Sequence, residues 1–173
     1  IRELSERGVR VRILTNSLVS NDVLAAHAGY AERRKQMIEA GAELYELKPD
    51  ARTVKQRAAN ETSKAALHTK AIAFDRKDVF IGSYNLDPRS GDINTEAGLY
   101  VESAELAQQL KDFMDDGVTM QDSYRVTLDE EGQLLWTTEE NGEQVYYHKD
   151  PESNWWQRFQ SGFIEILPVE DQL

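Results

Sequence analysis

At 173 residues the chain is long enough for one packed α/β unit with a small extension, and it has no cysteine for disulfide bonds or thiolate metal sites. The net charge of −11 is uneven: residues 1–101 hold 16 Lys and Arg against 14 Asp and Glu, whereas residues 102–173 hold 4 against 17. Because an acidic surface repels polyanions, this balance disfavours a protein that binds nucleic acid.

Helical and strand patterns alternate in the first part of the chain. Two helical patterns, each closed by a glycine, precede two strand patterns: the helices cover 2–7 and 30–40, the glycines are Gly8 and Gly41, and the strands cover 9–14 and 42–47. Each glycine stands where the end of a helix favours positive φ. Because strands separated by helices pair in parallel through crossover connections, we expect an α/β fold with a mixed, mostly parallel central sheet flanked by helices.

Three more strands and a helix are predicted after a polar loop over 48–63. The strands cover residues 67–74, 79–83 and 96–102, with a tight polar turn at 75–78. Ser103 can then cap a helix that ends near Gly117, with its apolar side chains on one face. We therefore place the first domain at residues 1–122.

The last part of the chain has a different pattern. Three short strands are predicted over 124–128, 134–138 and 144–148, and a final helix over 152–167. The connection before the third strand contains Asn141-Gly142, the dipeptide most typical of a tight hairpin. We therefore expect residues 123–173 to form a small extension, made of a β-hairpin and a helix.

The side chains suited to catalysis gather around one predicted hairpin. His68 and Lys70 are two residues apart on a strand and therefore project from the same face, while Gly82, Ser83 and Asn85 end the neighbouring strand. Polar groups that converge at strand ends, beside backbone opened by a glycine, suit a phosphate oxyanion. Lysine and asparagine can donate to the developing charge, and an imidazole can attack phosphorus or transfer a proton.

This pattern resembles the HxKxxxxD…GSxN signature of the phospholipase D superfamily. Every signature position is matched, by His68, Lys70, Asp75, Gly82, Ser83 and Asn85. The resemblance implies a fold in which two such motifs face each other across a pseudo-two-fold axis. It also implies a reaction without a metal ion or any other cofactor, in which one histidine becomes a phosphohistidine and the other protonates the leaving group.

Carried onto this chain, the resemblance gives each matched residue a role. His68 is the nucleophile or the general acid, and Lys70 and Asn85 bind the phosphate. Ser83 is a supporting donor to the phosphate, whereas Asp75 and Gly82 are structural members of the motif.

Three further positions lie outside the signature itself. Glu96 matches the downstream acid with which the superfamily holds a catalytic imidazole, where a carboxylate on Nδ1 fixes the tautomer. Whether it holds His68 or the opposing histidine stays open. Asn16 and His27 lie in family-like stretches and could line a headgroup pocket, but we favour a capping or packing role for each.

A narrower resemblance, to the cardiolipin synthase C branch of bacterial members, comes from residues 11–18, 27–30, 41–47 and 82–90. It implies phosphatidyl transfer between phospholipids such as phosphatidylethanolamine and phosphatidylglycerol, by a peripheral protein on the cytoplasmic face of the inner membrane. Because only one motif is present, we expect a piece of a longer protein, inactive alone and completed by a missing N-terminal half or a second copy. The alternative is a phospholipase D-like nuclease or phosphodiesterase that acts on nucleic acid, which the charge disfavours.

Overall fold

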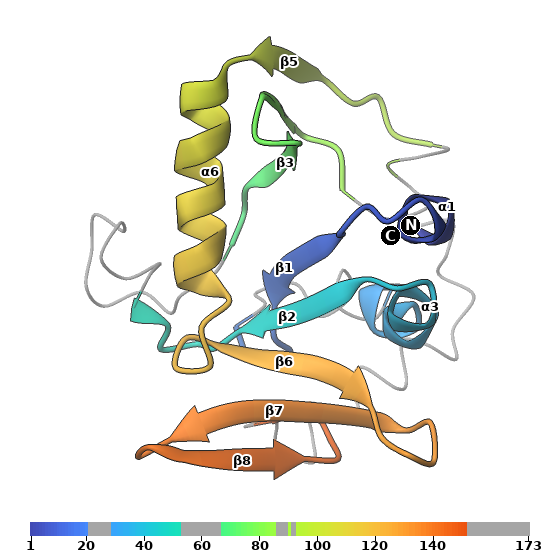
Figure 1. Ribbon diagram of the computed structural model, residues 1–173, viewed down its shortest axis with the longest axis vertical. Coiled ribbons are helices and arrows are strands. Elements are labelled where there is room, and N and C mark those ends of the chain that lie inside the picture. The colour runs from blue at the N-terminus through green and yellow to red at the C-terminus, as the bar shows by residue number, and fades with distance from the viewer. Residues whose placement is uncertain (21–28, 53–66, 86–89, 91–92, 152–173) are drawn as a thin grey trace.

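The computed structural model describes residues 1–20, 29–52, 67–85, 90 and 93–151, which form two β-sheets and the helices around them (Figure 1). The larger sheet has the order β1-β2-β6-β7-β8, with β1 Arg12–Asn16, β2 Glu43–Leu47, β6 Ser123–Leu128, β7 Leu134–Glu140 and β8 Glu143–Tyr147. The smaller sheet has the order β3-β4-β5, with β3 Lys70–Phe74, β4 Asp78–Gly82 and β5 Gly98–Glu102. The helices are α1 Arg2–Glu6, α3 Arg34–Glu39 and α6 Ala104–Gly117.

The α/β class and the mixed sheet predicted from the sequence are confirmed, but the prediction that the sheet is mostly parallel is wrong. Within the described ranges, β1 and β2 pair in parallel, whereas β2–β6, β6–β7, β7–β8, β3–β4 and β4–β5 all pair antiparallel. Parallel neighbours need a crossover connection, which helices supply only early in the chain. The short connections of β6 to β7 and of β7 to β8 allow only antiparallel pairing.

The three strands predicted within the extension are present as β6, β7 and β8, and they continue the larger sheet. β6 pairs along β2, with Leu44 opposite Val126 and Leu47 opposite Ser123. Asn141 and Gly142 both have positive φ, 54° and 82°, as the predicted tight turn between β7 and β8 requires. The domain boundary near 122 stays a prediction; the final helix over 152–167 and His27 lie outside the described residues, as does the polar loop beyond Arg52.

The core of the larger sheet is one apolar cluster around β2. Its fully buried members are Leu44, Tyr124, Val126 and Trp136, which come from β2, β6 and β7. A second, smaller cluster joins Leu47 and Ala51 to the partly buried Leu14 and Leu67. This second cluster lies where the larger sheet meets the chain that enters the smaller one.

A buried ion-pair cluster lies against the core. The Arg34 guanidinium contacts Glu46 at 2.7 Å and Asp150 at 2.7 Å, and the side chains of Arg34 and Glu46 are only 3% and 0% exposed. Tyr30 and Trp136 donate hydrogen bonds to the Glu46 carboxylate at 2.8 and 2.9 Å. Burial alone would lower the pKa of Arg34, but the charges of Glu46 and Asp150 outweigh it and raise that pKa above its usual value.

Helix α6 connects the two sheets, running from the end of β5 to the start of β6 (Figure 1). The predicted cap is confirmed, because the Ser103 hydroxyl accepts from the Leu106 N–H at 3.2 Å. The helix packs on β3 and β4, and near its C-terminal end Asp115 pairs with Arg12 of β1 at 2.8 Å. Gly117 lets the helix approach β1, since a Cβ there would lie 2.6 Å from the Leu14 side chain. Of the helices described, none is long and apolar enough to span a bilayer.

Candidate active site

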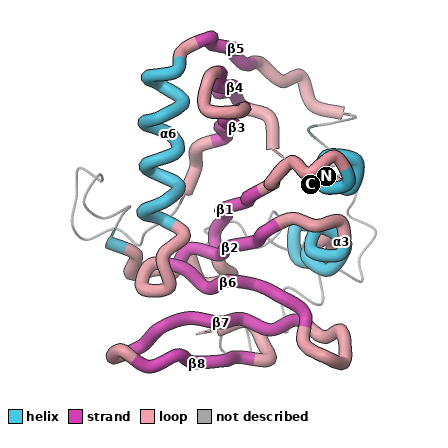
Figure 2. The backbone as a smooth tube through the Cα atoms, in the orientation of Figure 1, coloured by secondary structure: helices cyan, strands magenta, loops and turns pink. Residues whose placement is uncertain are grey.

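The predicted site residues gather at one end of the smaller sheet. Lys70, which begins β3, lies opposite Gly82 at the end of β4, and Gly82 lies opposite Gly98 at the start of β5. The residues just outside these three positions are therefore at the same end of the sheet. They are His68, Ser83, Asn85 and Glu96. The two sheets and the loops at this end can be followed in Figure 2.

Asp75 lies at the opposite end of the smaller sheet. Asp75 and Arg76 have positive φ, 49° and 60°, and the Lys77 N–H donates to the Phe74 carbonyl at 2.9 Å. These are the features of a type I′ turn, which joins β3 to β4. Asp75 thus lies beyond Phe74–Asp78, the last pair of the β3–β4 ladder, which is four pairs away from Lys70–Gly82.

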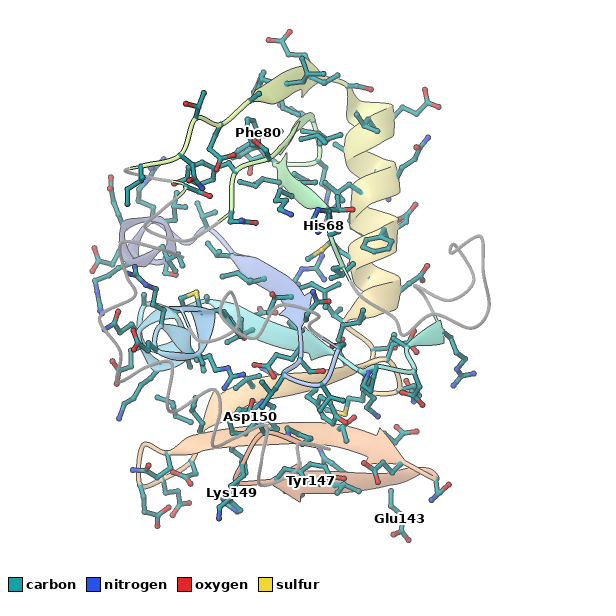
Figure 3. All side chains as sticks on the ribbon, turned by 180° about the vertical axis from the view of Figure 1, so that it is seen from behind. His68, Phe80, Glu143, Tyr147, Lys149 and Asp150 are labelled. Atoms are coloured by element: carbon teal, nitrogen blue, oxygen red, sulfur yellow. The ribbon has the colours of Figure 1, made fainter. Side chains whose placement is uncertain are left out.

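His68 lies just before β3 rather than inside it, so the strand predicted over 67–74 begins too early. The physical reason is that the Leu67 peptide groups bond to a side chain, that of Asn16, and not to a neighbouring strand. Lys70 folds back on this segment, and its Nζ donates to the His68 carbonyl at 3.0 Å. His68 itself is exposed, and Figure 3 labels it near the start of β3. An ammonium group and the main chain that carries the imidazole are therefore in contact.

A pair of glycines shapes the sheet beside Lys70. Gly82 and Gly98 face each other across β4 and β5, and the Phe80 ring lies over both of them. A Cβ at Gly82 would lie 2.6 Å from the Ala97 carbonyl and 3.0 Å from the Phe80 ring. The predicted structural role of Gly82 thus has a steric basis, because no other residue fits between these two groups.

Ser83 and Glu96 are hydrogen-bonded to each other. The Ser83 hydroxyl donates to Glu96 Oε2, and it accepts from the Ala97 N–H at 3.0 Å. Asn94 Nδ2 donates to the other carboxylate oxygen, Oε1, at 3.4 Å. Neither of these two hydrogen bonds comes from His68, and whether Glu96 holds this imidazole or the opposing one stays a prediction.

Glu96 is held in its ionised form. Its pKa lies below the ordinary 4.5, first because of the hydrogen bond from Ser83, then because of those from Ser90 and Asn94, with a further contribution from the Lys70 charge. The buried Ser90 hydroxyl also accepts from the Asn85 N–H at 3.2 Å. Ser90 and Asn94 were not identified from the sequence as site residues, although Ser90 lies within the family-like stretch 82–90.

No group of three or more His, Cys, Asp or Glu residues that could hold a metal ion occurs among the described residues.

Residues 1–116 match the family described as "Cardiolipin synthase, PLD-like domain". The chain belongs to this family. The resemblance to the phospholipase D superfamily is thereby confirmed, and the matched range contains the whole 68–96 motif.

Two kinds of curated relative resemble this member of the cardiolipin synthase family. Cardiolipin synthase C of Escherichia coli strain K12 is 41% identical over 168 residues, which cover 95% of this chain and 35% of that protein. An uncharacterized protein found in two Helicobacter pylori strains is 29% identical over 167 residues, which cover 95% of this chain and 32% of the relative. The chain thus spans about a third of the length of these relatives, and it matches no solved structure.

Removing the Ser83 hydroxyl should raise the pKa of Glu96. In Ser83→Ala the largest cause of the lowered pKa is lost, so the pKa should move up toward the ordinary 4.5. Because the wild-type pKa is depressed, the contacts of the carboxylate stabilise the fold above about pH 4.5 and are lost as the pH falls. Carboxyl ¹³C NMR titration measures the shift. Glu43, whose pKa is lowered by Arg10, is the internal control, and an unchanged Glu96 titration would contradict the prediction.

Proposed function

We propose that the full-length protein containing this chain is a phosphatidyltransferase that makes cardiolipin from two phospholipids through a phosphohistidine. The observation that carries the proposal is the contact of Lys70 with His68 at the sheet end that also holds Ser83, Asn85 and Glu96. Membership of the cardiolipin synthase family and the 41% identity to cardiolipin synthase C support it. We place the protein at the cytoplasmic face of the bacterial inner membrane, as a peripheral protein.

The proposed reaction has two displacements. A histidine nitrogen lone pair attacks phosphorus, a P–N bond forms, and the bond from phosphorus to the headgroup alcohol breaks as a second group protonates the leaving oxygen. With phosphatidylethanolamine as donor, ethanolamine leaves. The hydroxyl of phosphatidylglycerol then gives its proton to the same group, attacks phosphorus and breaks the P–N bond, which forms cardiolipin and restores the histidine.

Lys70 and Asn85 are proposed to hold the non-bridging phosphate oxygens during both steps. In the described structure Lys70 Nζ bonds to the His68 carbonyl, a neutral acceptor that an anionic phosphate would displace. Glu96 carries a negative charge that would repel the same phosphate. Hydrogen bonds from Ser83 and Asn94 delocalise that charge, and the remaining lone pairs of the carboxylate can accept from an imidazole, either that of His68 or one brought by another part of the protein.

A second half-site must supply the other histidine. The remainder of the longer protein or a second copy of this chain is the proposed source, and exposed apolar side chains on the smaller sheet support such a partner. Ile72 and Phe74 of β3 and Tyr100 of β5 project from one face of this sheet and are 40%, 42% and 58% exposed. Exposed apolar groups gathered on one face are typical of an interaction surface. We expect the isolated 173-residue chain to be inactive or very weak.

The proposal is tested by product identity. Full-length protein is incubated with vesicles of labelled phosphatidylglycerol and phosphatidylethanolamine, and separately with supercoiled DNA. We expect labelled cardiolipin and free ethanolamine in equal amounts, and uncut DNA. The 173-residue chain is the matched control and should give neither product. Nicked DNA with no cardiolipin would replace this proposal with the nuclease alternative.

A further inference from the structure

Asn16, the last residue of β1, holds the main chain of Leu67 by two hydrogen bonds. Its Nδ2 donates to the Leu67 carbonyl at 2.9 Å, and its Oδ1 accepts from the Leu67 N–H at 2.7 Å. The side-chain amide thus satisfies both polar groups of this residue, as a neighbouring β-strand would. Leu67 immediately precedes His68, so this contact fixes the backbone from which the imidazole projects.

We propose that Asn16 is a positioning residue that sets the direction of the His68 side chain for attack or proton transfer. The inference rests on the proposed function, and it deepens that function by adding a residue that touches no substrate. Asn16 acts through the peptide groups of Leu67. Phosphoryl transfer depends on near-attack geometry, and a displacement of about 1 Å is enough to cost about 100-fold in rate.

His68 needs such a hold because the sheet does not provide one. Strand β3 begins at Lys70, so the pairing of β3 with β4 starts two residues beyond His68. The His68 side chain is exposed and gains little from packing. The ladder of β3 therefore fixes the chain after His68, and the Asn16 amide fixes it before.

The Leu67 side chain provides a different constraint from the Asn16 amide. It packs against the cluster of Leu47 and Ala51, which determines where Leu67 lies. An apolar contact does not determine how the two peptide planes of Leu67 are rotated, because dispersion is not directional. The paired hydrogen bonds do, since a donor and an acceptor are fixed at once. Asn16 thus sets the orientation of the chain that enters His68.

Asn16 is itself well anchored. The next residue, Ser17, donates its N–H to the Leu47 carbonyl at 3.2 Å. The Ser17 and Ser20 hydroxyls share a hydrogen bond at 2.7 Å, and Ser20 also donates to the Leu47 carbonyl at 2.8 Å. Both serines are 1% exposed. Through Asn16, the rigid end of the larger sheet therefore positions a residue at the end of the smaller one.

The test compares Asn16→Ala and Asn16→Asp in the full-length protein. We expect kcat to fall about 100-fold in each, with KM changed less than about twofold, because orientation and not binding is lost. The carboxylate in Asn16→Asp keeps the acceptor but repels the Leu67 carbonyl. The ratio of its kcat to that of the wild type should therefore rise as the pH falls, because a protonated carboxyl can donate again. Asn141→Asp, in the remote β7–β8 turn, is the matched control and should keep wild-type kinetics.

A second measurement does not depend on the lipid substrate. Vanadate adopts the five-coordinate geometry of phosphoryl transfer, so its affinity reports on the arrangement of the reacting groups. We expect Asn16→Ala to lose about as much vanadate affinity as kcat, and the Leu67 amide to exchange its hydrogen faster. The melting temperature of the Asn16→Ala protein should fall by only a few degrees and stay well above the assay temperature.

The outcomes separate this inference from the proposed function. If Asn16→Ala has wild-type kcat and vanadate affinity although the Leu67 amide exchanges faster, Asn16 only joins the two sheets and the inference is overturned. It is also overturned if the wild-type protein binds no vanadate, or if the loss of kcat merely follows thermal unfolding. If the wild type binds vanadate but makes no cardiolipin, the proposed function fails, and a loss of vanadate affinity in Asn16→Ala still supports the positioning role.

Discussion

His68→Ala in the full-length protein should abolish cardiolipin formation, and the size of the loss should show which role His68 has. If His68 is the nucleophile, the loss should reach about 10⁶-fold, as when a covalent nucleophile is removed. If it is the general acid, the loss should be about 10²- to 10⁴-fold. The measurement is kcat for labelled phosphatidylglycerol in vesicles that also contain phosphatidylethanolamine.

The leaving group gives an independent check on this role. A p-nitrophenyl phosphodiester needs little protonation of its leaving oxygen, so an enzyme that lacks its general acid should still release nitrophenolate rapidly. His148→Ala is the matched control, because the His148 side chain is 70% exposed and lies in the chain that follows β8, far along the sequence from the motif. Cardiolipin formation by His68→Ala at more than about a tenth of the wild-type rate would contradict any catalytic role.

The strands and helices were predictable from the sequence because local patterns determine them. The glycines after the first two helical patterns, the Ser103 cap and the Asn141-Gly142 turn each depend on the conformational preferences of single residues. Strand direction was not predictable in the same way. The pairing of β6 with β2 brings together residues about 80 apart in sequence, such as Leu44 and Val126, and no local pattern encodes it.

The candidate site was predictable to the extent that a signature specifies it. The register places His68, Lys70, Ser83, Asn85 and Glu96 at one sheet end, and their catalytic roles stay predictions. The signature does not include the residues that hold the site residues in place by hydrogen bonds. Ser90 and Asn94 bond to Glu96, and Asn16 bonds to the chain before His68 across 51 residues of sequence, so only the folded chain reveals them.

Arg34→Met should be the most damaging substitution for stability outside the candidate site. It leaves the Glu46 carboxylate, which is 0% exposed, without its cation, and an unpaired buried charge costs about 3–5 kcal/mol of unfolding free energy. Asp150 also loses its ion pair with Arg34, which joins the chain after β8 to α3. Urea unfolding, followed by the fluorescence of Trp136, measures the change. All proteins compared also carry Trp155→Phe and Trp156→Phe, so that the fluorescence comes from Trp136 alone.

The surface pair of Arg10 and Glu43 is the matched control, because the same substitution there removes an ion pair of similar length. Arg10 contacts Glu43 at 2.6 Å, but its side chain is 67% exposed, so Arg10→Met should cost less than about 1 kcal/mol. Replacing both partners, in Arg34→Met with Glu46→Gln, should recover part of the loss. The glutamine oxygen still accepts from Tyr30 or Trp136, and the buried charge is gone. Equal losses at Arg34 and Arg10 would show that burial of the cluster contributes nothing to the stability of this fold.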